Sequence, residues 1–61
     1  MTKPTVKLVG EDANAFAIMG KVKRALEKAG MKEEAKKYIE EATSGDYNNL
    51  LVVTMKYVNV K

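Results

Sequence analysis

The chain has 61 residues and a net charge of +3. Its length limits it to one small domain, residues 1–61, because folded units typically span about 100 to 200 residues. The sequence contains no cysteine and no histidine, which excludes disulfide bonds and leaves only oxygen ligands for any metal ion. With 46% hydrophobic and 31% charged residues, the composition is that of a globular protein. A chain of this size buries little surface, so tight packing or self-association has to stabilise it.

The sequence gives no sign of a membrane segment or a secretion signal. Its apolar runs, such as residues 50–53, are far shorter than the ~20 residues that a membrane helix requires. Residues 1–10 lack the long apolar region of a signal peptide. We therefore expect a cytoplasmic protein without a membrane partner.

A first strand is predicted over residues 5–9, where Val6 and Leu8 face one side and Lys7 faces the other. Pro4 suits the entrance to a strand because proline has no N–H for the ladder. Gly10 then ends the alternating pattern. The sequence thus predicts a short, half-buried strand near the N-terminus.

A first helix is predicted over about residues 13–29, capped by the side chain of Asp12 or Asn14. Its apolar residues recur at three- and four-residue spacings and form one stripe: Ala15, Ile18, Met19, Val22, Ala25, Leu26 and Ala29. Gly20 is unfavourable inside a helix, which indicates either close approach of another backbone or simple tolerance, and we favour close approach. Gly30 is placed to end the helix in the left-handed conformation, with Leu26 and Met31 in contact in a Schellman motif.

A second helix is predicted over about residues 32–43, with Glu33 and Glu34 at its positive end. Gly45 is expected to end this helix, and Asp46 is placed to cap another one. Residues 50–60 are ambiguous, because their β-branched side chains suit one long strand while helical spacing competes. We divide the segment into a helix over about residues 46–56 and a strand over residues 57–60.

The predicted fold is α+β, with three helices packed on a small two-stranded sheet that the chain termini form in the order β-α-α-α-β. Val6, Leu8, Val58 and Val60 would make one apolar face of this sheet. A two-stranded ribbon alone is marginal in water. The helices, or a strand from another chain, are therefore needed to cover it.

Two segments carry a resemblance to known proteins. Residues 10–20 read G-E-D-A-N-A-F-A-I-M-G, and residues 42–51 read A-T-S-G-D-Y-N-N-L-L. This pattern resembles a family of short bacterial and phage proteins with a G-E-D-x-N-A-F-x-I-x-G motif and an A-T-S-G-D-Y-x-x-L-L motif, for which no activity is known. Ala13 stands where that family commonly has glycine. The resemblance implies a stable domain with a shared architecture and no particular reaction.

Acidic residues offer one candidate site. Glu11, Asp12 and Asp46 could supply oxygen ligands for Mg²⁺ or Ca²⁺. All three precede helices, where acids cap the exposed N–H groups, so we favour the structural interpretation and predict no metal and no cofactor. Ser44 has no histidine to activate it. We therefore predict that the protein is not an enzyme.

Basic residues offer a second candidate. Lys21, Lys23, Arg24 and Lys28 could contact a nucleic-acid backbone. Glu27 interrupts this face, and aromatic residues for base stacking are scarce. A solvated helix face is the favoured interpretation, and weak nucleic-acid binding is the alternative function.

Large apolar side chains offer the third candidate. Phe16, Met19 and Tyr57 are the residues we expect in a contact with another chain, Phe16 above all because it lies on the flank of the first stripe. The function that the sequence favours is a small interaction module without catalytic activity, which binds a protein partner or a second copy of itself as a homodimer.

Overall fold

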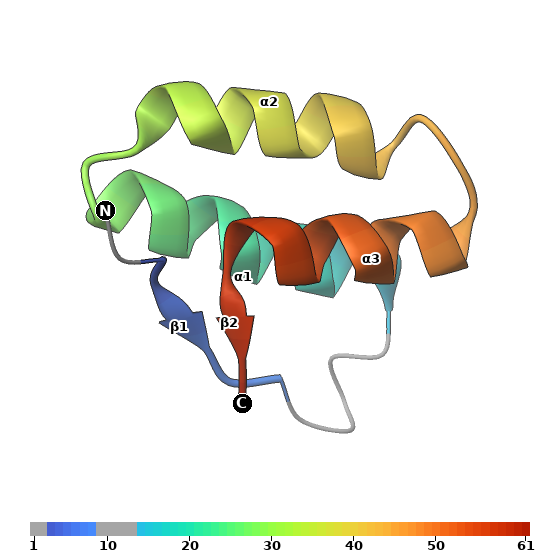
Figure 1. The fold of residues 1–61 in the computed structure, drawn as a ribbon, viewed down its shortest axis with the longest axis horizontal. Helices are drawn as coiled ribbons and strands as arrows, with labels where there is room; N and C mark the ends of the chain where they lie inside the picture. Colours follow the sequence, from blue (N-terminus) through green and yellow to red (C-terminus); the bar gives the residue numbers. More distant parts are fainter. Residues whose placement is uncertain (1–2, 9–13) are drawn as a thin grey trace.

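A computed structural model describes residues 3–8 and 14–61. They form β1 (Thr5–Val6), α1 (Ala15–Lys28), α2 (Lys32–Ala42), α3 (Tyr47–Tyr57) and β2 (Asn59–Val60). Figure 1 shows α2 on one side of α1 and α3, and the two strands on the opposite side. The structure confirms the predicted α+β fold with its β-α-α-α-β order. Within the described part of the chain, no helix has both the length and the apolar character to cross a membrane.

The two strands are parallel, and Val6 lies opposite Val60. The amide of Asn59 donates to the carbonyl of Pro4 at 2.9 Å, and the amide of Lys61 donates to the carbonyl of Val6 at 3.0 Å. Parallel neighbours require a long crossover connection, which the three helices provide. The sheet therefore joins the two ends of the chain.

The boundary between α3 and β2 differs from the prediction. Tyr57 belongs to α3 and not to the strand, because its ring packs against Tyr38 and holds the last helical turn in place. Val58 is extended and buried, whereas Val60 is 42% exposed. The apolar side of the sheet consequently depends on Val6 and Val58. The first strand ends at Val6 and not at residue 9, since the described residues 7–8 are not part of it. Residues 9–13, with the Gly10 turn and the predicted start of the first helix, lie outside the described residues.

Both predicted N-terminal caps of described residues are present. The Asn14 side chain accepts a hydrogen bond from the amide of Phe16 at 2.8 Å. The Asp46 side chain accepts one from the amide of Asn49 at 2.9 Å. Each cap satisfies an N–H group that has no partner within its helix. These two caps determine where α1 and α3 begin.

The end of α1 is the predicted Schellman motif. Gly30 has a φ of 78°, in the left-handed region that glycine adopts without strain. The amide of Met31 donates to the carbonyl of Leu26 at 2.8 Å, and the amide of Gly30 donates to the carbonyl of Glu27 at 3.0 Å. This pair of bonds defines the motif. It turns the chain from α1 into α2.

Gly45 has a different role from the predicted helix stop, because α2 already ends at Ala42. A Cβ atom on Gly45 would lie 2.9 Å from the Cβ and Cγ atoms of Asn49. The Asn49 side chain is held there because its Nδ2 atom donates to the carbonyl of Glu41 at 2.9 Å. Close approach, and not a positive φ, therefore requires glycine at this position.

The core lies where the three helices and the sheet meet. Tyr38, at the middle of α2, is its largest fully buried side chain. The buried apolar residues come from β1, the three helices and the position between α3 and β2: Val6, Ile18, Val22, Leu26, Ala35, Tyr38, Ala42, Leu50, Val53 and Val58. The stripe predicted for the first helix contains the three buried residues of α1, Ile18, Val22 and Leu26, whereas its last member, Ala29, is exposed.

One buried polar contact joins α2 to α3. The hydroxyl groups of Tyr38 and Thr54 share a hydrogen bond of 2.8 Å, and both side chains are buried. Burial raises the pKa of the Tyr38 phenol, and the hydrogen bond with Thr54 offsets part of this effect. The neutral phenol is therefore the form that the core holds.

Replacing Thr54 tests this contact. We expect Thr54→Val to lower the free energy of unfolding by about 1–3 kcal/mol, because the buried Tyr38 hydroxyl loses its partner. Tyr38→Phe should lower the free energy of unfolding by less, because the Thr54 hydroxyl that loses its partner can bond a carbonyl of the preceding helical turn. The variant with both substitutions should lose less free energy of unfolding than the two single variants lose together. Urea unfolding of all four proteins measures this, and a Thr54→Val variant as stable as the parent chain would contradict it.

Candidate interaction surface

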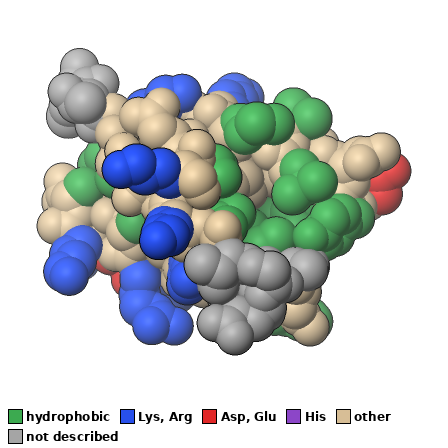
Figure 2. Space-filling view, turned by 90° about the horizontal axis from the view of Figure 1, so that it is seen from below, with side chains coloured by type: hydrophobic (Ala, Val, Ile, Leu, Met, Phe, Trp, Pro, Cys, Tyr) green, Lys and Arg blue, Asp and Glu red, His purple; other side chains and the backbone are tan. Residues whose placement is uncertain are grey.

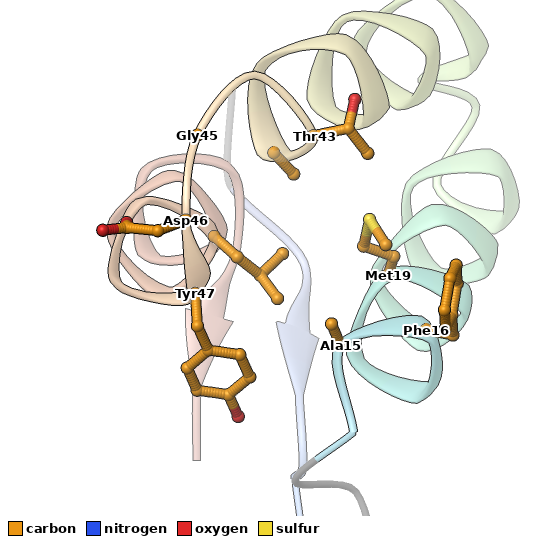
Figure 3. Close-up of a pocket in the computed structure, with 9 residues that line it drawn as sticks. Ala15, Phe16, Met19, Thr43, Gly45, Asp46 and Tyr47 are labelled. Atoms are coloured by element: carbon orange, nitrogen blue, oxygen red, sulfur yellow. The ribbon is translucent and has the colours of Figure 1, made fainter.

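A shallow apolar groove of about 290 Å³ lies where α1 and α3 begin. One wall comes from the start of α1, and the other comes from the end of α2, the following loop and the start of α3 (Figure 3). The groove is lined by Ala15, Phe16, Met19, Ala42, Thr43, Gly45, Asp46, Tyr47 and Leu50. Small residues supply much of the lining and leave the groove open.

The helix caps place the groove residues. Because Asn14 starts α1, Ala15 and Phe16 lie in its first turn and Met19 follows one turn later. Because Asp46 caps α3, its carboxylate is engaged at the helix start and points away from the groove in Figure 3. Asp46 therefore adds no charge to the centre of the groove.

Phe16 and Tyr47 are the exposed aromatic residues at this groove. The Phe16 side chain is 81% exposed, and Tyr47 is 44% exposed. Figure 2 shows hydrophobic side chains gathered over the end where α1 and α3 begin, with Lys and Arg toward the opposite end. The visible face of the molecule is thus divided into an apolar end and a basic end.

The three residues predicted to contact another chain do not lie together. Phe16 and Met19 line the groove, whereas Tyr57 belongs to the far end of α3 and packs edge-on against Tyr38, with ring centroids 5.6 Å apart. Tyr47 also lines the groove, although it is not among the three residues predicted for the contact. All nine lining residues lie in two stretches of the chain, residues 10–20 and 42–51.

The predicted reason for Gly20 is wrong within the single chain. A Cβ atom built on Gly20 would meet only a guanidinium nitrogen of Arg24, at 3.8 Å, which is ordinary van der Waals contact. No backbone approaches this position among the residues described. The fold of one copy consequently does not require glycine there.

The four candidate nucleic-acid contacts are divided between two flanks of α1. At about 100° per residue, Lys21 and Lys23 lie about 200° apart around the helix axis. Lys21 donates to the carbonyl of Lys7 at 3.2 Å, so it also ties α1 to the segment that follows β1. Arg24 and Lys28 are exposed on the side of Lys21. A phosphate backbone could follow three of the four cations but not Lys23.

Metal-binding geometry is lacking in the described residues. Glu11 and Asp12 lie outside them, and Asp46 is engaged as a helix cap. No group of three or more Asp, Glu, His or Cys side chains in the described ranges could hold an ion. The remaining polar cluster is centred on Glu41.

Glu41 joins the end of α2 to the end of α3. Its carboxylate accepts a hydrogen bond from the Tyr57 hydroxyl and forms an ion pair with Lys56, whose Nζ atom lies 3.0 Å from Oε1. The bonds from Tyr57 and Lys56 lower the pKa of Glu41. The Glu41 carboxylate in turn raises the pKa of Tyr57 to about 12. Near neutral pH, the protonated Tyr57 phenol cannot act as a general base, and the charged Glu41 carboxylate cannot act as a general acid. The two groups therefore form a structural bridge between α2 and α3.

The chain matches no protein-family model, no curated protein and no solved structure. The function therefore has to be argued from the geometry of the groove and of the helix face beside it.

Glu41→Gln should shift the titration of Tyr57. We expect the pKa of Tyr57 to fall from about 12 toward its ordinary value of 10.0, because the charged acceptor that holds the phenol proton is removed. In the parent chain, the raised pKa of Tyr57 means that its contribution to stability is complete below about pH 10 and is lost as the pH rises toward 12. Glu41 acts in the opposite direction, and its contribution is lost as the pH falls below 4.5.

NMR titration of the tyrosine ring carbons measures these values residue by residue. Glu40→Gln is the matched control, because the Glu40 carboxylate has the weakest effect among the carboxylates that raise the pKa of Tyr57. A pKa of Tyr57 that responds equally to both variants would contradict the assigned bridge.

Proposed function

We propose that this protein is a small protein–protein interaction module that performs no catalysis and self-associates through the end of the molecule where α1 begins. One observation supports this most strongly: a phenylalanine, Phe16, stands 81% exposed beside an apolar groove. Burying a phenylalanine side chain contributes about 1.5–3 kcal/mol, so its exposure in the single chain leaves a substantial stabilisation unused.

Phe16 is not needed for the fold of one copy. Ile18, Val22 and Leu26 are the buried residues of α1 and supply its part of the core. The first turn of α1 is held by the Asn14 cap through the backbone of Phe16, and not through its ring. A partner surface gives the Phe16 ring the apolar contact that the core does not.

The surroundings of Phe16 strengthen the argument. A single exposed apolar residue is ordinary on a protein surface. Here Met19 and Tyr47 line the same groove, and methionine and aromatic residues are enriched at the centres of interfaces. Small residues beside them leave room for a side chain from a partner.

Nucleic-acid binding has weaker support. Lys21 is already bonded to the carbonyl of Lys7, and Lys23 faces away from the other cations of α1. The exposed aromatic residues gather at the groove, away from the basic end seen in Figure 2. Association with another protein chain would bury the exposed Phe16 ring, which the fold of one copy does not require, so we favour it.

Phe16→Ser should weaken self-association about tenfold or more, because it removes the largest exposed apolar side chain and leaves the core intact. Val52→Ser is the matched control: Val52 is 63% exposed on α3 and does not line the groove. Sedimentation equilibrium from about 1 μM to about 1 mM protein measures both variants against the parent chain. A parent chain that stays monomeric throughout, or equal effects of the two substitutions, would contradict the proposal.

A further inference from the structure

Three residues form a ridge on the face of α1 that points away from the core. Phe16, Gly20 and Arg24 are spaced four residues apart, so their positions follow one another along the helix surface. Gly20 lies about 160° around the helix axis from the fully buried Val22. We call these three residues the α1 ridge.

Gly20 is the first unexplained feature of the ridge. A glycine inside a helix is less favourable than alanine by about 1 kcal/mol. Its φ is not positive, and an added Cβ would meet only the Arg24 guanidinium at 3.8 Å in the described part of the chain. Glycine is, however, the residue that lets a second backbone approach closely.

Arg24 is the second feature. Its exposed guanidinium group lies over Gly20 and has no hydrogen bond or ion pair with any residue of the described chain. A guanidinium group placed over an aromatic ring is attracted by the ring's quadrupole. Phe16 of the same chain cannot provide this contact, because it is eight residues away, about 12 Å along the helix axis.

We infer that two copies of the protein associate through the α1 ridge, with their α1 helices antiparallel and crossing at Gly20. The inference rests on the self-association proposed above and specifies its geometry. In this arrangement, position 16 of one copy lies opposite position 24 of the second copy. Each Phe16 ring stacks on the Arg24 guanidinium of the second copy, and the two-fold symmetry makes this contact twice.

The antiparallel direction follows from charge. Parallel helices in the same register would place Arg24 against Arg24 of the second copy, and like charges repel. In antiparallel helices, Arg24 of one copy instead lies on the aromatic face of Phe16 of the second copy, which is an attractive contact. Ridges of residues spaced by four interlock at a crossing angle of about −50°, the commonest class of helix packing. With glycine at the crossing point, the two backbones can come close enough for both stacked pairs to form.

Charge-altered variants test the pairing. We expect Phe16→Arg and Arg24→Glu each to weaken self-association about tenfold or more, because one places arginine against arginine and the other places glutamate against the ring face. An equimolar mixture of the two variants should associate within about threefold of the parent chain, since one half of the mixed dimer gains an ion pair and the other half keeps Phe16 on Arg24. Lys36→Glu makes the same charge change on α2, away from the ridge, and should leave association unchanged. Circular dichroism verifies that every variant is folded.

The possible outcomes separate the two proposals. If the parent chain associates and Phe16→Arg weakens it, but the mixture does not recover, the ridge geometry is overturned while self-association stands. If the parent chain is monomeric up to about 1 mM, both are overturned.

Gly20→Ala is an independent test of the crossing point. It should raise the melting temperature of the monomer, because alanine favours the helix and the added methyl group meets no clash. The same change should weaken association about tenfold, because two methyl groups separate the helices. An unchanged affinity would overturn the crossing at Gly20.

Discussion

The hydrogen bond between the hydroxyl groups of Tyr38 and Thr54 fixes the contact on which the helix arrangement depends. Tyr38 is the largest fully buried side chain, and it lies at the middle of α2. A buried hydroxyl without a partner is costly, so the position of α3 that places the Thr54 hydroxyl 2.8 Å from that of Tyr38 is favoured. The hydrophobic effect is non-directional, whereas this hydrogen bond favours one register of α2 against α3.

The remaining elements follow from that register. Once α2 and α3 are aligned, Tyr57 reaches both the Tyr38 ring and the Glu41 carboxylate. The last turn of α3 therefore ends where β2 can pair with β1. Strands of two residues contribute little by themselves. They close the domain because the helices have already brought the two ends of the chain together.

Much of this fold could be predicted from the sequence, because the decisive signals were local. The Asn14 and Asp46 caps, the Gly30 turn and the spacing of buried residues in α1 each depend on neighbours within a few positions. The end of α3 could not be predicted in the same way. Tyr57 has strand propensity, and its contacts with distant residues of α2 override that preference.

The candidate surface was predictable only in part, for the same physical reason. The flank position of Phe16 on its helix indicated exposure, and the structure places it at 81%. The groove itself arises from the junction of α2 and α3 meeting the start of α1, so no single segment contains it. Gly45 shows this most clearly, because its close contact with Asn49 depends on a bond from Asn49 to the carbonyl of Glu41.

The two faces of α1 have different roles. Ile18, Val22 and Leu26 bury one face of α1, while Phe16 and Arg24 stand on the face that the single chain leaves uncovered. NMR spectra of the backbone amides over a dilution series test this division of α1 most directly. We expect the signals around Phe16, Gly20 and Arg24 to move with concentration and those of α2 to stay unchanged. Spectra that are identical at every concentration, or shifts that are largest around Tyr38, would contradict the account.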